Sequence, residues 1–264
     1  MVNIIILFIP PVVVFLSYFL QLHCCTEGNV SRIYTAVVHG TFSFITVIAL
    51  LLAVYKNRKN PFTRKAWLLF LFGIILFIPS GIFRYFTGIK YPWFSSMLFL
   101  IALIPIVIFI NIISRPMRHI IYSKSNRVYL DLLVSIILVV IISSFIIPVF
   151  TDFNKSINHE KKLIILNIFK PLFNILLITP ISGVLLLLGL KKDNYPYFLI
   201  GFGFFCALLG DILNHYYLLS GIPNFLTFSK YTGTAELLYI MLGGLTEAFK
   251  GQSEDRSLSN KKCS

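Results

Sequence analysis

The fold is decided by PYFLIGFGFFCALLGDILNHYYLLSGIPNFLTFSKYTGTAELLYIMLGGLTEAFK, which runs from Pro196 to Lys250. This stretch contains two apolar runs long enough to cross a membrane, and Asp211, His215 and Glu236 lie inside them. An ionised side chain in hydrocarbon is costly, so one that is kept there normally faces a bundle interior, a partner charge or a water-filled cavity. We therefore expect a hairpin of membrane helices that carries a polar site.

Composition supports a membrane location for the whole chain. Hydrophobic residues make up 57% of the sequence and charged residues 12%, and the mean hydropathy is +0.85. These values exclude a soluble domain with a polar surface. The net charge of +13 lies mostly in short loops between apolar runs, so we read it as a topology signal and an attraction to anionic lipid, and we expect no nucleic-acid partner.

Eight apolar runs reach the roughly 20 residues that a spanning helix needs. The sequence therefore predicts an all-α, polytopic membrane bundle of eight transmembrane helices. The runs are Ile4 to Leu22, Thr35 to Tyr55, Ala66 to Phe83, Trp93 to Ile113, Val128 to Phe150, Leu163 to Leu190, Pro196 to Leu219 and Tyr231 to Phe249.

The domain organisation follows from these runs. Residues 1–22 form an N-terminal anchor, residues 35–250 a seven-helix membrane bundle, and residues 251–264 a short polar tail. The first run has two readings, a cleaved signal peptide or a retained anchor. We favour the anchor because a basic segment before the run and a small-residue cleavage pair before Cys24 are both missing from the sequence.

Loop charges orient the bundle, because Lys and Arg in short loops stay on the cytoplasmic side. Fifteen basic residues fall on the side that carries the tail and seven on the other side, and Lys170 lies inside a helix. Both termini are therefore predicted to be cytoplasmic, in a multi-pass protein of the cell membrane.

This orientation places the ionisable residues of the helices in one layer. Six of them, from five helices, share the outer half of the predicted bundle and are our candidate ligand-binding residues: Asp211, His215, Glu236, Lys170, His39 and Arg84. Glu247 lies eleven residues after Glu236, on nearly the same helix face and close to the cytoplasmic surface.

Helical spacing indicates the face that Asp211 occupies. Gly203, Ala207 and Gly210 precede it on the same face, and small residues let membrane helices approach closely. We therefore expect Asp211 to point into protein rather than lipid.

The polar layer also has plainer interpretations. Lys170 and Asp211 form, on one reading, an internal ion pair that only sets helix register. Asp211 and His215 supply two of the ligands that a metal would need, but no third is adjacent, and the four cysteines lack metal-ligand spacing, so no metal and no cofactor are expected. No nucleophile or phosphate-binding motif indicates catalysis, and the last helix lacks the lysine that retinal requires.

A family resemblance supports a signalling role. The succession NPFTRKAWLLFLFGIILFIPSGIFRYF, NIFKPLFNILLITPISGVLLLL, GFGFFCALLGDILNHYYLLSGIP and TGTAELLYIMLGGL resembles the multi-helix sensor modules, with seven or eight transmembrane helices, that precede bacterial and archaeal histidine kinases and diguanylate cyclases. Their pattern is matched by Asp211 with Tyr216, by the turn Gly221 to Pro223, and by Glu236 with Tyr239.

The likeness covers roughly Asn60 to Phe249 and has two departures. Asn214 and His215 stand where such modules have apolar or aromatic residues, and no kinase or cyclase domain follows Lys250. The resemblance therefore implies a sensor with a separate cytoplasmic kinase or cyclase as its partner, and with a small molecule, ion or proton as its ligand.

Two other functions stay open. GDILNHYYL also resembles the acidic motif of lysoplasmalogenase-type membrane hydrolases, but such enzymes are expected to use acids from two helices, and the third and fourth helices supply no Asp or Glu. A small transporter would show an internal repeat or paired broken helices, and we find no repeat. The sequence favours a sensor without enzymatic activity of its own.

Overall fold

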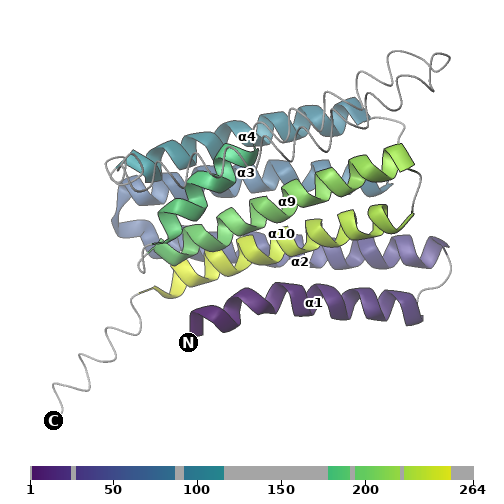
Figure 1. Ribbon diagram of the computed structural model, residues 1–264. Helices are drawn as coiled ribbons and strands as arrows, with labels where there is room; N and C mark the ends of the chain where they lie inside the picture. Colours follow the sequence, from purple (N-terminus) through teal and green to yellow (C-terminus); the bar gives the residue numbers. More distant parts are fainter. Residues whose placement is uncertain are drawn as a thin grey trace, which may run out of the picture.

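Helices account for almost all of the residues that the structure describes. The structure is a computed structural model, and it describes residues 2–24, 28–86, 92–115, 178–190, 194–220 and 223–250, among which no strand occurs. The helices lie side by side in a bundle (Figure 1). They are α1 (Val2–Cys24), α2 (Gly28–Lys56), the short 3-10 helix η1 (Asn57–Lys59), α3 (Pro61–Phe86), α4 (Pro92–Ser114), the segment Ile178–Gly189, α9 (Tyr195–Ser220) and α10 (Pro223–Phe249).

The helices confirm the all-α prediction and extend beyond the apolar runs that predicted them. The largest extensions are at the starts of α2 and α10, which begin at Gly28 and Pro223 rather than at Thr35 and Tyr231. At 29 and 27 residues these helices are about 43 and 40 Å long, against roughly 30 Å for the hydrocarbon layer. The added residues of both helices include polar and charged side chains, such as Asn29 and Arg32 in α2 and Asn224 and Lys230 in α10. The predicted run at 128–150 lies outside the described residues, and the run at 163–190 is described only from residue 178 onward.

Three of the described helices contain a segment long and apolar enough to cross a membrane, as expected of a membrane protein. These segments are Ile33–Lys59, Pro61–Pro79 and Tyr195–Leu213. Large apolar side chains are also exposed around the bundle, with Phe15, Phe44 and Phe72 each more than half exposed. Water would penalise this surface and lipid would not. The total of eight spans stays a prediction.

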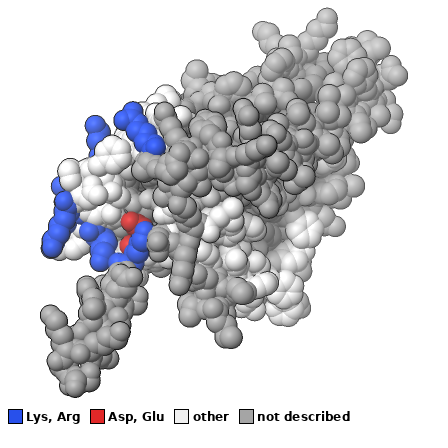
Figure 2. Space-filling model, turned by 60° about the vertical axis from the view of Figure 1, so that its left-hand side comes forward, with Lys and Arg blue, Asp and Glu red and all other residues white. Residues whose placement is uncertain are grey.

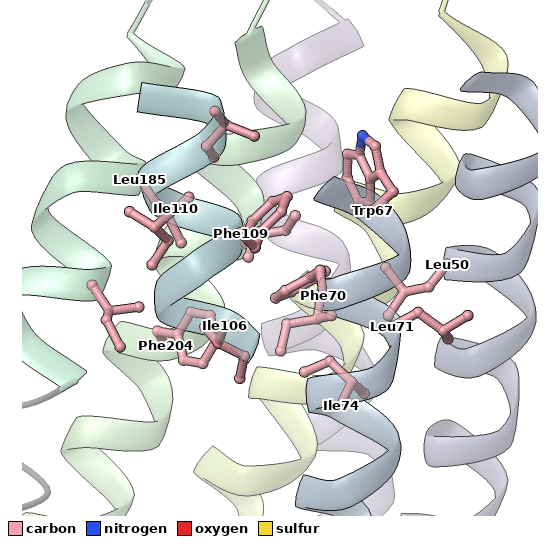
Figure 3. Close-up of a cluster of buried hydrophobic side chains, with 14 of the residues drawn as sticks. Leu50, Trp67, Phe70, Leu71, Ile74, Ile106, Phe109, Ile110, Leu185 and Phe204 are labelled. Carbon is pink, nitrogen blue, oxygen red and sulfur yellow. The ribbon is translucent and has the colours of Figure 1, made fainter. Parts of the chain in front are cut away.

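An aromatic cluster holds α3, α4 and α9 together (Figure 3). Phe70 of α3 stacks on Phe109 of α4 with ring centroids 4.6 Å apart, and Trp67 and Phe204 pack around them. All four side chains are almost fully buried. This cluster packs α3, α4 and α9 against one another, and α10 lies against the same side through its contacts with α9.

One end of the bundle collects both chain ends and much positive charge. The start of α1 and the end of α10 lie at this end (Figure 1), where Lys and Arg side chains also gather (Figure 2). We call it the basic end, and it includes Lys56, Arg58, Lys59 and Lys250. We call the opposite end the outer end, after the predicted orientation.

Candidate functional site

The candidate site lies along the contact between α2 and α10, which run parallel. Three contacts mark the path from the outer end to the basic end. A Cβ built on Gly233 would lie 4.0 Å from His39 Cε1. The hydroxyl of Thr46 donates to the carbonyl oxygen of Leu237 at 3.1 Å, and Asn57 Nδ2 donates to Glu247 Oε1 at 3.1 Å.

The residues that make these contacts belong to rows of residues spaced four and three positions apart on both helices. We call them the α2–α10 seam; they are His39, Ser43, Thr46, Leu50, Ala53 and Asn57 on the α2 side, and Gly233, Leu237, Ile240, Gly244 and Glu247 on α10. A repeat of this kind is typical of two helices that pack at a small crossing angle over a long distance. The seam therefore joins the two ends of the bundle without interruption.

Three helices enclose the outer part of the seam. His39 of α2 is 7% exposed and Glu236 of α10 is 4% exposed, so both polar groups are buried in protein. A Cβ built on Gly203 of α9 would lie 3.0 Å from the carbonyl oxygen of Glu236, so α9 backs directly onto this turn of α10. We call His39, Gly233 and Glu236 the outer site.

The first helix covers the outer end of the seam through polar contacts. The Tyr231 hydroxyl of α10 donates to Gln21 Oε1, and Gln21 Nε2 donates to Thr35 Oγ1 of α2 at 3.4 Å. Tyr34 also donates to the carbonyl oxygen of Ser17 at 3.1 Å. Thr35 lies one turn before His39, so these groups form the rim above the outer site.

Asp211 lies on α9 directly after Gly210 and is half-buried. The small residues before it pack as predicted, because Cβ atoms built on Gly203 and Gly210 would meet Glu236 and Thr232 of α10. A neighbouring pocket of about 270 Å³ has an almost wholly apolar lining, made of Leu209, Ile212, Leu213, Tyr216 and Thr232. Asp211 does not line that pocket.

The other predicted site residues are placed only in part. Arg84 lies on α3 and His215 on α9, but their side chains are outside the described part of the chain. Lys170 falls outside the described residues altogether, so its pairing with Asp211 stays a prediction. Of the six, the structure places His39 of α2 against Gly233 of α10, one turn before the buried Glu236. That the six form one site stays a prediction.

Glu247 occupies the other end of the seam, as its spacing from Glu236 predicts. It is 6% exposed, and its Oε2 lies 4.0 Å from Lys250 Nζ while its Oε1 accepts from Asn57. Asn57 Nδ2 also donates to the carbonyl oxygen of Ala53 at 2.9 Å. A buried carboxylate therefore ties the end of α10 to the point where α2 becomes η1.

Sequence reasoning missed the polar stripe of α2. Thr35, His39, Ser43 and Thr46 lie on one face of the helix, and the last three are buried. Their spacing of four, four and three residues inside an apolar run was visible in the sequence. Of these four residues, only His39 is ionisable, and only His39 was predicted as a site residue. A hydroxyl group costs less free energy in a membrane than a charge does, so Thr35, Ser43 and Thr46 do not stand out in an apolar run.

The outer site suits a proton or a small polar ligand better than a metal. No group of three His, Cys, Asp or Glu residues able to hold a metal occurs among the described residues. A buried carboxylate or a buried imidazole can instead take up a proton, and a carboxylate can bind a small cation or a hydrogen-bond donor.

Comparisons with known proteins do not narrow this choice. No protein-family model, no curated protein and no solved structure matches the chain. The functional argument therefore depends on the residues themselves.

Proposed function

We propose that this chain is a multi-pass membrane sensor, in which the outer site takes up a proton or small ligand and α10 carries the change to the basic end. One observation supports this proposal most directly. Glu236 and Glu247 lie on one face of α10 and both are buried, and the α2–α10 seam passes alongside Glu236 and ends at Glu247. At eleven residues they are about 16 Å apart along the axis.

The middle of the seam supports transmission because it is closely packed. A Cβ built on Gly244 would lie 3.1 Å from the carbonyl carbon of Ala49 and 3.1 Å from Leu50 Cδ2. Closely packed helices tend to shift as units, so a displacement of α10 at one end would be passed along the seam to the other end. A change of charge or contact at Glu236 would in this way alter the surroundings of Glu247.

The partner in this proposal is a cytoplasmic kinase or cyclase, as the sequence resemblance implies. The signal would reach it at the basic end, where α10 ends and η1 joins α2 to α3. A lipid hydrolase is less well supported, because α3 and α4 contain no Asp or Glu in their sequences.

The proposal is tested by substituting the outer carboxylate. The thermal unfolding midpoint of the chain in lipid nanodiscs is measured in mildly acidic and mildly alkaline buffer, and with added Na⁺, K⁺ or Ca²⁺. We expect the midpoint of the wild type to depend on at least one of these conditions and that of Glu236→Gln to lose the dependence. Glu254→Gln, which removes a carboxylate from the tail, is the matched control.

An unchanged dependence in Glu236→Gln would remove Glu236 from the ligand site. A wild type that responds to none of the conditions would contradict the proton and cation forms of the proposal. Release of a fatty acid or aldehyde from lysophospholipids by the purified protein would favour the hydrolase instead.

A further inference from the structure

A groove of about 420 Å³ opens at the basic end, between the end of α2, η1 and the last residues of α10. Cations and apolar side chains line it together. The lining residues are Leu52, Tyr55, Lys56, Arg58, Lys59, Ala248 and Phe249. Among the described residues, the charged side chains that line the groove are all positive, and neither Glu236 nor Glu247 is one of its lining residues.

The position of the groove matches the boundary between hydrocarbon and headgroups. Ile33–Lys59 is one of the segments able to cross a membrane, and the groove lies at its last turns. Leu52, Tyr55 and Phe249 are 41%, 62% and 56% exposed there. An exposed tyrosine beside lysines and arginines is typical of a membrane interface.

Arg58 is already held in place within this groove. Its Nη1 donates to the Tyr55 hydroxyl at 2.6 Å, and its Cζ lies 4.5 Å from the centre of the Tyr55 ring. A guanidinium held by one hydrogen bond and by stacking keeps its other N–H groups for a second acceptor, and phosphate oxygens fit that geometry. The side chain therefore needs little reordering to bind a phosphate.

We propose that this groove binds one anionic phospholipid from the surrounding bilayer. The phosphate lies among Lys56, Arg58 and Lys59, and an acyl chain lies along Leu52 and Phe249. Both halves of the site are needed, because the cations recognise the headgroup and the apolar residues recognise the chain. The site is separate from the outer site and does not depend on a sensory role.

Native mass spectrometry of the detergent-purified chain tests this site with phosphatidylglycerol, and with phosphatidylcholine as the zwitterionic comparison. We expect the wild type to retain phosphatidylglycerol preferentially. Removing two cations in Lys56→Gln/Arg58→Gln should weaken that retention by about tenfold or more. The matched control is Arg64→Gln/Lys65→Gln, which removes the same charge from exposed residues of α3 that do not line the groove.

Three outcomes would overturn the site. Both double variants lose the lipid equally if net charge alone attracts it. Phosphatidylcholine and phosphatidylglycerol are retained to the same extent if the headgroup charge plays no part. Inorganic phosphate displaces the lipid if the site is one for a soluble anion. Circular dichroism of each variant, and a single Arg58→Gln variant as a milder change, separate loss of binding from loss of folding.

Discussion

The two ends of the α2–α10 seam bury the same chemical group in different surroundings. At the basic end, Glu247 accepts a hydrogen bond from Asn57 and lies near Lys250, so its charge is balanced locally. At the outer end, Glu236 lies where α2, α9 and α10 meet, with a histidine and a rim of hydroxyl groups above it. The first arrangement holds a helix end in place, and the second is suited to exchanging a proton or ligand.

The two ends of the seam also differ in how closely α2 and α10 pack. A Cβ on Gly244, towards the basic end, would lie 3.1 Å from Ala49 and Leu50, closer than ordinary contact, whereas among the described residues a Cβ on Gly233 at the outer end would meet His39 alone, at ordinary contact distance. The looser packing at Gly233 is compatible with a binding site, and the closer packing at Gly244 is compatible with transmission of a helix shift. The seam therefore combines a site and a link in one helix pair.

The largest expected effect comes from breaking the basic end. Glu247→Ala removes the acceptor of one Asn57 hydrogen bond and the carboxylate near Lys250, so we expect it to lower the free energy of unfolding by about 1–3 kcal/mol. The measurement is reversible unfolding in mixed detergent and dodecyl sulfate micelles. Glu247→Gln keeps an acceptor oxygen in the same place and should cost clearly less. Equal stability of Glu247→Ala and the wild type would show that this end does not hold α10.

The packing difference is tested by a pair of glycine substitutions. Gly244→Ala and Gly233→Ala gain the same helix propensity, so the difference between their free energies of unfolding isolates packing. We expect Gly244→Ala to be less stable than Gly233→Ala by about 1–2 kcal/mol, because its Cβ meets the backbone of Ala49. If the two variants are equally stable, the seam is not tighter towards the basic end.

The smallest effect is expected at the rim of the outer site. Tyr231→Phe removes the hydroxyl that donates to Gln21, and interhelical hydrogen bonds in membranes contribute about 0.6 kcal/mol on average. Tyr18→Phe is the control, because the centroid of the Tyr18 ring lies 5.1 Å from that of the Tyr231 ring and the substitution keeps this edge-to-face contact. Faster amide exchange in α1 of Tyr231→Phe alone would confirm that this bond docks the first helix. Equal amide exchange rates in α1 of the two variants would mean that the aromatic rings, and not the Tyr231 hydroxyl, dock the first helix.

The helices themselves were predictable from the sequence because each is a long apolar run. The break between α2 and α3 was marked by Asn60 and Pro61, and Asn60 Oδ1 accepts from the backbone N–H groups of Phe62 and Thr63 at 3.1 and 3.2 Å. Helix ends were less predictable, because α2 and α10 continue past the apolar length into polar sequence.

The pairing of α2 with α10 was not predictable from one sequence. These helices are nearly two hundred residues apart, and hydrophobicity does not say which helices of a bundle are neighbours. Glu236 and His39 stand out in the sequence as ionisable residues in apolar runs, but only the fold places His39 against Gly233, one turn before Glu236. The polar stripe of α2 likewise gains a role from the fold, because its Thr46 donates to Leu237 of α10.

Spin-label distances at the basic end test the central claim, that the outer site and the basic end are coupled. Labels at Lys65→Cys and Phe249→Cys, in a chain whose four native cysteines are replaced, report the separation of α3 and α10 in nanodiscs. We expect the distance distribution to change between mildly acidic and mildly alkaline buffer in the wild type and in Glu254→Gln. In Glu236→Gln we expect a single distribution under both conditions. A wild-type distribution that does not change, or one that changes equally in Glu236→Gln, would contradict the coupling.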